Sequence, residues 1–280
     1  MTRLRVGPLP TWMDAGRLLG PGFIQEEEGG YWSASLSAEA AADVSARLRG
    51  LGFGGQAVEV HVEPKLSRTL VRTARSEDSR RRWHTTPGFL RPGARTAPEH
   101  QEDPEARWSV TPEALSLTIG RMARRGARVV DLMCGVGGSS IGFARSGARV
   151  HALDVSPGRI AVARHNASIY GVSGQITFEH ADARRRLPDL RGDLLFLDPP
   201  WGEHWDRRRV QLAELPLLAD LWPMTTGFAE VWLKLPPSFD AASLPTTPMP
   251  VRCTPIFGES EGDFRRVKLL LVRIGSPGPS

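Results

Sequence analysis

The sequence has few cysteines, and this limits the kinds of site that it can build. Only Cys134 and Cys253 occur among 280 residues, and neither belongs to a C-x-x-C motif. The seven histidines show no spacing typical of metal ligands. Zinc sites and disulfide frameworks need clustered cysteines or histidines. We therefore expect no metal site, no disulfide scaffold, and a reducing, cytoplasmic location.

Long apolar runs are also absent. No stretch of about 18 apolar residues occurs, roughly the length that a membrane-spanning helix needs. The first residues combine arginines with Gly-Pro-Leu-Pro and lack the continuous apolar segment of an export signal. We therefore expect neither an export signal nor a membrane partner. The hydrophobic content of 40% is nevertheless ordinary for a globular protein, so a sizeable core is possible.

The charge balance is moderately positive. The chain has 36 lysines and arginines against 31 aspartates and glutamates, which gives a formal net charge of +5. Such an excess favours polyanionic partners such as nucleic acids. A GC-rich coding sequence would also enrich arginine, so charge alone does not identify the partner.

The first part of the chain has the pattern of a small α+β module. A helix is predicted over 37–49, with Ser37 as its N-cap. A half-buried strand is predicted from the alternation of valine with polar residues over 58–63. Five aromatic residues are candidates for the core of this module: Trp12, Phe23, Tyr31, Trp32 and Phe53.

A polar, arginine-rich segment follows this module. Residues 75–95 include three consecutive arginines and a tryptophan, and residues 96–106 have the composition of a linker. We therefore predict an accessory domain over 1–104 and a second domain over 105–280. The arginine-rich segment could contact nucleic-acid phosphates while an aromatic ring stacks on a base, or it could be a solvated connector. The candidate contacts are Arg80, Arg81, Arg82 and Trp83.

The second domain alternates strand-like and helix-like segments, which predicts βαβ units and a parallel sheet. Three strand-like runs end the chain, over 231–237, 249–258 and 265–274. The last two are joined by the turn-rich sequence G-E-S-E-G-D, which predicts an antiparallel hairpin. The expected fold is α/β and Rossmann-like: a mostly parallel seven-stranded sheet with an antiparallel C-terminal hairpin, plus the small N-terminal α+β domain.

A glycine-rich loop follows the first of these strands, in the sequence D-L-M-C-G-V-G-G over 131–138. Glycines let a backbone turn tightly and approach a ligand closely. Asp154 and Asp182 end the next two strands, and the ends of parallel strands share one edge of the sheet. A carboxylate there can accept the ribose hydroxyls of a nucleoside cofactor. Each aspartate alone could instead be a turn or capping residue.

The acidic start of the loop distinguishes two nucleoside cofactors. The pyrophosphate of a dinucleotide favours bare helix N-terminal amides, whereas S-adenosylmethionine carries a sulfonium and an amino-acid tail and accepts acidic neighbours. The sequence therefore favours S-adenosylmethionine. From this loop and the strand ends, the expected cofactor contacts are Asp131, Cys134, Gly135, Gly137, Asp154, Asp182 and Ala183.

The fourth strand of this domain ends in D-P-P-W-G over 198–202. An exocyclic amino group on a base is a poor nucleophile, because its lone pair is delocalised into the ring. Hydrogen bonds from that group to the Asp198 carboxylate and the Pro199 carbonyl would aim the lone pair at a methyl group, by positioning and electrostatics. Trp201 offers a face on which a base can stack. Alternatively, the D-P-P-W-G segment has no role in catalysis and only forms a rigid exit from the strand, with a buried tryptophan.

These segments, together with R-W-S-V-T-P-E over 107–113, resemble the trimethylguanosine synthase family of RNA cap guanine-N2 methyltransferases, over roughly 105–275. The resemblance implies that Thr111 and Pro112 help to cover the cofactor, that Ser109 lies near the base, and that Trp201 stacks on the methylated guanine. The family usually has Ser or Asn where this chain has Asp198. A guanosine in ribosomal, transfer or other RNA is therefore as good a candidate as a cap.

The expected reaction is direct methyl transfer to an exocyclic amino group of a base, with guanine N2 in RNA as the main hypothesis. The alternatives are an adenine-N6 or small-molecule amine methyltransferase, a non-catalytic RNA-binding protein with a vestigial pocket, and, least favoured, a nicotinamide dehydrogenase.

Neither cysteine has the context of a nucleophile. Lys234 could meet a phosphate, but the simpler interpretation is an ordinary surface lysine.

Overall fold

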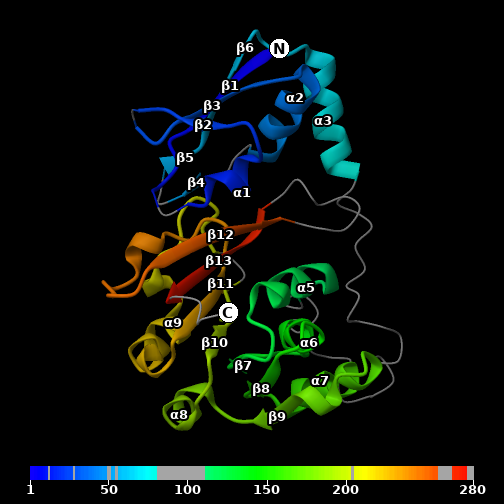
Figure 1. The fold of residues 1–280 in the computed structure, drawn as a ribbon, viewed down its shortest axis with the longest axis vertical. Helices are drawn as coiled ribbons and strands as arrows, with labels where there is room; N and C mark the ends of the chain where they lie inside the picture. Colours follow the sequence, from blue (N-terminus) through cyan, green and yellow to red (C-terminus); the bar gives the residue numbers. More distant parts are fainter. Residues whose placement is uncertain are drawn as a thin grey trace. The chain divides into compact units, whose positions relative to one another are not determined.

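The computed structural model describes residues 1–11, 13–27, 29–48, 52–53, 56–80, 111–202, 205–257 and 267–275. The described residues form two compact units, drawn together in Figure 1. One unit takes its residues from 1–85, 201–214 and 235–272, and the other from 86–200, 215–234 and 273–280. The predicted boundary near residue 104 falls outside the described residues, so that division stays a prediction. None of the described helices is long and apolar enough to span a membrane.

The N-terminal part of the first unit is a four-stranded sheet in the order β2-β3-β1-β6, with antiparallel pairing throughout. As predicted, a helix begins after Ser37, whose hydroxyl accepts a hydrogen bond from the Ala40 amide at 3.1 Å. The predicted strand is also present and half-buried. The elements are β1 (Thr2–Gly7), α1 (Ala15–Leu19), β2 (Ile24–Gln25), β3 (Trp32–Leu36), α2 (Ala38–Leu48), β4 (Gly52–Phe53), β5 (Gln56–Ala57), β6 (Glu59–Glu63) and α3 (Arg68–Arg80).

The core of this sheet differs from the aromatic core that we expected. Aliphatic residues form it: Leu4, Val6, Leu18, Leu19 and Leu48 are almost fully buried. Phe53 is buried as expected, but Phe23, Tyr31 and Trp32 are only half-buried, and Trp12 lies outside the described residues. The Tyr31 ring lies under the Arg5 guanidinium, 3.7 Å from its carbon, and its hydroxyl donates to Glu59. These polar partners keep Tyr31 near the surface.

The second sheet has seven strands in the order β12-β13-β11-β10-β7-β8-β9 (Figure 1). Pairing is parallel from β11 to β9, and β12 and β13 form the antiparallel hairpin end. The predicted α/β fold is therefore confirmed, although the predicted turn over 258–263 lies outside the described residues. The strands are β7 (Arg128–Asp131), β8 (Arg149–Asp154), β9 (Ile176–His180), β10 (Leu194–Leu197), β11 (Glu230–Leu235), β12 (Val251–Phe257) and β13 (Val267–Gly275).

Helices α5 (Glu113–Met122), α6 (Gly138–Arg145) and α7 (Pro157–Ile169) form a layer on one side of the parallel strands, and α8 (Ala183–Arg186) and α9 (Pro216–Leu221) lie on the other side (Figure 1). Helix α5 was not predicted. It packs closely on α6 because both helices have glycine at the contact: a Cβ on Gly142 would lie 2.2 Å from the Ser116 carbonyl oxygen. This close approach brings the start of α5 beside the glycine-rich loop.

Candidate functional site

Three aspartates lie at the carboxyl ends of neighbouring parallel strands. Asp131 ends β7, Asp154 ends β8, and Asp182 follows β9 by two residues. The register pairs Asp131 with Ala152 and Asp154 with His180, so these strands end at the same edge of the sheet. We call this edge the rim. In open α/β sheets, ligands bind at the carboxyl ends of the strands.

The glycine-rich loop connects β7 to α6 at the rim. Gly135 and Gly137 have positive φ angles of 53° and 89°, which other residues rarely adopt. A Cβ on Gly137 would lie 3.1 Å from that of Ala163, whereas one on Gly135 would meet nothing within 4 Å. The Asn166 amide donates to the Val136 carbonyl at 3.0 Å. Helix α7 thus holds the loop from one side while the backbone at Gly135 stays open.

Asp154 ties this loop to the end of β8. Its two oxygens accept backbone hydrogen bonds from Gly135 and Ser156, each at 2.9 Å. The Cys134 amide donates to the Leu153 carbonyl at 2.8 Å. A carboxylate has acceptor capacity beyond two hydrogen bonds. Asp154 can therefore fix the loop and still accept from a ligand, a structural role that the sequence did not suggest.

Asp131 is the most deeply buried of these acids, with an exposed fraction of 0%. The Ser140 hydroxyl donates to its Oδ2 at 2.6 Å, while Oδ1 has no hydrogen-bond partner among the described residues. Burial raises the pKa of Asp131 to about 7, the Ser140 bond opposes that rise, and the nearby Asp198 charge adds to it. A buried acceptor without a partner is costly, so Oδ1 is suited to a ligand with a positive or donor group.

Asp198 follows β10 directly and is paired with Lys234 of β11. The Lys234 Nζ lies 2.5 Å from Asp198 Oδ2, and the side chains are 8% and 19% exposed, respectively. Our interpretation of Lys234 as an ordinary surface lysine is therefore wrong. Sequence reasoning missed this pair because its members are 36 residues apart. Burial raises the pKa of Asp198, and the charge and hydrogen bond of Lys234 oppose that rise.

Beyond Asp198 the chain leaves the sheet through a buried Pro199 and an exposed Pro200. The half-buried Trp201 ring meets Trp205 edge to face, with ring centroids 6.0 Å apart. The Arg207 guanidinium carbon lies 5.8 Å from the centroid of Trp205. We did not single out Trp205 or Arg207 from the sequence, although the run W-D-R-R-R over 205–209 combines aromatic and basic residues as nucleic-acid surfaces do.

The other expected contacts have different surroundings. Thr111 is buried, with its hydroxyl 3.3 Å from that of Ser139, and Pro112 precedes α5. Asp182 caps α8 by accepting from the Arg184 amide at 2.9 Å, and Ala183 is buried behind it. Of the remaining expected contacts, Ser109, Arg81, Arg82 and Trp83 lie outside the described residues, as does the side chain of Arg80.

Neither cysteine has the surroundings of a nucleophile. Burial raises the pKa of the Cys134 thiol well above its ordinary value, and the charges of Asp131 and Asp154 add to this effect. Burial also raises the pKa of Cys253 to about 12. Since the thiolate is the reactive form, both thiols are unreactive at neutral pH. Within the described ranges, no group of three or more His, Cys, Asp or Glu side chains could hold a metal ion.

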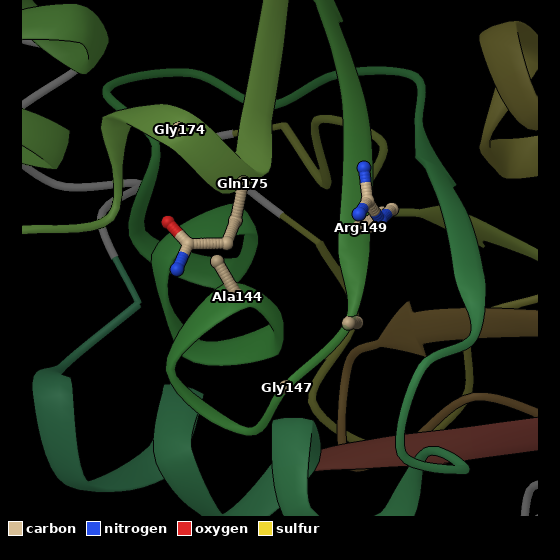
Figure 2. Close-up of a pocket in the computed structure, with 6 residues that line it drawn as sticks. Ala144, Gly147, Arg149, Gly174 and Gln175 are labelled. Carbon is tan, nitrogen blue, oxygen red and sulfur yellow. The ribbon is translucent and has the colours of Figure 1, made fainter.

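The protein also has a surface hollow of about 410 Å³, whose lining residues are drawn in Figure 2. Its lining includes Arg149, the first residue of β8, and Gly147 two residues before it. Asp154 ends the same strand, so the hollow and the rim are at opposite ends of β8. The hollow therefore takes no part in the site described above.

Comparison with known proteins adds independent information. Residues 126–214 match the family described as RNA cap guanine-N2 methyltransferase. The chain is 32% identical over 109 residues to trimethylguanosine synthase of Schizosaccharomyces pombe, covering 36% of this chain and 45% of that protein. It is 31% identical over 118 residues to ribosomal RNA small subunit methyltransferase J of Rhodopseudomonas palustris, covering 39% and 53%, respectively. The chain thus spans about half the length of these curated relatives.

Among solved structures, an RNA methyltransferase from Salinibacter ruber in complex with S-adenosyl-L-homocysteine is similar, with a TM-score of 0.41 and 18% identity. The match covers 61% of this chain and 95% of that one.

The rim fits S-adenosylmethionine, which carries a sulfonium and an ammonium group. Asp131 offers a buried oxygen that has no partner among the described residues, and a Cβ on Gly135 of the same loop would meet nothing within 4 Å. A pyrophosphate would instead meet like charge at Asp131. The strand order, the acidic rim and the family match over 126–214 together support a class I S-adenosylmethionine-dependent methyltransferase fold for this chain.

Proposed function

We propose that this chain methylates an exocyclic amino group of a base in RNA, with guanine N2 as the target. The observation that carries the proposal is the position of Asp198 at the end of β10, next to the strand that ends in Asp131. Asp131 is the candidate contact for the cofactor, and Asp198 is the candidate contact for the amine. Two adjacent strand ends therefore supply one carboxylate for each reactant.

The cofactor would be held by Asp131, by the loop at Gly135 and by Asp154. It would be covered by Thr111 and Pro112. Asp182 and Ala183 are our candidate contacts for its adenine. When bound, S-adenosylmethionine supplies an electrophilic methyl group on its sulfonium. The reaction then requires an amine whose lone pair is oriented toward that methyl, which is a matter of positioning and electrostatics.

The residues from Asp198 to Trp201 would provide that orientation. An ionised carboxylate and a backbone carbonyl are acceptors only, so Asp198 and Pro199 can bind the two N–H groups of an exocyclic amine. Trp201 would stack on the base, with Ser109 near its edge. After transfer the methylated nitrogen carries an extra proton, which Asp198 or water can accept.

RNA as the substrate is supported by three separate features. The matched family and both curated relatives are described by names that refer to RNA or to guanosine. The net charge of +5 favours a polyanion. Trp205 and Arg207 adjoin the D-P-P-W motif in the chain and combine a stacking face with a positive charge.

We further propose that residues 1–104 form an accessory domain that contacts RNA through Arg80, Arg81, Arg82 and Trp83.

Product analysis tests this proposal. RNA from a heterologous host is incubated with the protein and S-adenosylmethionine, digested to nucleosides, and analysed by mass spectrometry against synthetic standards. We expect N2-methylguanosine to appear only with both the protein and the cofactor present. Methylation confined to an oxygen or carbon atom would contradict the proposal, whereas N6-methyladenosine would keep the amine chemistry and change the base.

The proposed role of Asp131 predicts that cofactor affinity depends on pH. Because burial raises the pKa of Asp131 to about 7, this carboxyl holds a proton below that pH in the ligand-free protein. A cationic ligand group favours the ionised form, so binding must release the proton. Affinity should therefore rise as pH increases, by up to about tenfold per unit below pH 7, and level off above it.

Isothermal titration calorimetry with S-adenosylmethionine between about pH 5.5 and 8.5 measures this effect, since a one-unit change in pKa corresponds to about 1.4 kcal/mol. Asp131→Asn is the matched variant, because it keeps the shape of the side chain and cannot ionise. The pH dependence should disappear in this variant. An affinity that is flat with pH in the unmodified protein would mean that Asp131 does not bind the positive part of the cofactor.

A further inference from the structure

The placement of Lys234 follows from strand register. Strands β10 and β11 are parallel, and Leu197 pairs with Leu233. Asp198 directly follows the last residue of β10, and Lys234 follows Leu233 in β11, so the two side chains lie side by side at the rim. The hydrogen bond from Lys234 reaches Oδ2 of Asp198. No other described side chain bonds this carboxylate, so Oδ1 remains available to a substrate.

A lysine at this position carries a cost that needs an explanation. Its side chain is 8% exposed, and burying an ammonium is strongly unfavourable unless a partner compensates for its charge. Asp131 at the end of β7 lies close enough for the charges of Asp198, Lys234 and Asp154 to act on its pKa. Asp198 raises the pKa of Asp131, and Lys234 lowers it. Lys234 therefore offsets the repulsion between two carboxylates that serve two different reactants.

We infer that Lys234 is a positioning residue for methyl transfer: it fixes Asp198 through Oδ2, balances its charge, and leaves Oδ1 as an acceptor for the substrate amine. This inference rests on the proposed function. An ionised carboxylate only accepts hydrogen bonds, whereas an asparagine amide also donates them. The ion pair thus keeps this position an acceptor only, suited to the N–H groups of an amine, where the family resembled in sequence uses a neutral Ser or Asn.

Four variants test the inference at saturating cofactor: Lys234→Met, Asp198→Asn, the double variant, and Lys65→Met as a control that removes an exposed lysine elsewhere. Lys234→Met should lower the rate at pH 7 by at least about tenfold, as expected for a misplaced catalytic contact. Because Lys234 opposes the raised pKa of Asp198, its loss raises that pKa further. The remaining activity of Lys234→Met should therefore increase at higher pH than that of the unmodified protein.

The double variant distinguishes charge balance from packing. A neutral asparagine without a lysine beside it should be at least about tenfold faster at pH 7 than Lys234→Met. It should also lose the pH shift, because nothing at position 198 titrates. A double variant no faster than Lys234→Met would overturn the inference, as would a Lys234→Met protein with the rate and pH profile of the Lys65→Met control.

Product identity separates this inference from the proposed function. If the unmodified protein methylates an amino group and the double variant is not rescued, the role of Lys234 is wrong and the proposed function stands. If the unmodified protein methylates only oxygen or carbon atoms, the proposed function fails, and the inference that rests on it fails too. Thermal unfolding of each variant, with and without S-adenosylhomocysteine, verifies that the compared proteins are folded.

Discussion

Replacing Asp198 by alanine is expected to lower the rate of methyl transfer by at least about a hundredfold, the size of effect seen when an enzyme loses a contact to the reacting group. Alanine removes the acceptor for the amine and leaves the glycine-rich loop and Asp131 in place. Binding of S-adenosylhomocysteine should therefore stay within about tenfold, or roughly 1.4 kcal/mol. Single-turnover methylation and calorimetry measure the two quantities separately.

Two comparisons make this result interpretable. Asp198→Ala breaks the ion pair with the buried Lys234, which should reduce the free energy of unfolding by roughly 3 kcal/mol, so activity must be measured well below the melting temperature. Asp220→Ala is the matched control. It also removes an aspartate from an ion pair, with Arg184, but that pair is on the surface, with side chains 48% and 56% exposed. Normal turnover in a folded Asp198→Ala protein would show that Asp198 does not position the amine.

Replacing Trp201 by alanine should have the second large effect. Stacking of a base on an aromatic ring contributes about 1–3 kcal/mol, so kcat/KM for RNA should fall about tenfold to a hundredfold. Trp201 is half-buried, and its ring meets that of Trp205. The loss should therefore appear in substrate use, and cofactor binding should stay within about tenfold.

Trp201→Phe is the control for this prediction, because phenylalanine keeps a stacking face. It should retain most of the kcat/KM that alanine loses. Steady-state kinetics of the two variants on one RNA substrate provide the comparison. Equal losses in Trp201→Phe and Trp201→Ala would indicate that the tryptophan shapes the loop and does not stack on the base.

Much of the second sheet could be predicted from the sequence, because its strands are short apolar runs that end in recognisable residues. Asp131, Asp154 and Asp198 each follow such a run, and parallel strands bring their ends to one edge. The D-P-P-W motif marks the end of β10, which lies beside the end of β7. These inferences depend only on local pattern and on the rule that parallel strands end together.

The contacts that depend on distant partners could not be predicted. Lys234 lies in the run V-W-L-K-L, where a charged residue suggests exposure, and only the register of β10 against β11 gives it a buried partner. Helix α5 was missed because it is only ten residues long and its apolar residues show a weak helical periodicity. Its close packing also depends on Gly142, which belongs to another helix. Two other roles could not be predicted for the same reason: Asp154 anchors the glycine-rich loop, and Arg5 covers the Tyr31 ring.

A crystal structure of the protein with S-adenosylhomocysteine and guanosine monophosphate would test the central claim most directly. The account predicts that the amino-acid tail of the cofactor product contacts Asp131, and that the guanine N2 lies within about 3.2 Å of Asp198 Oδ1. The ring of the base should lie against Trp201. A cofactor product bound away from the ends of β7 and β8, or a guanine whose amino group points away from Asp198, would contradict it.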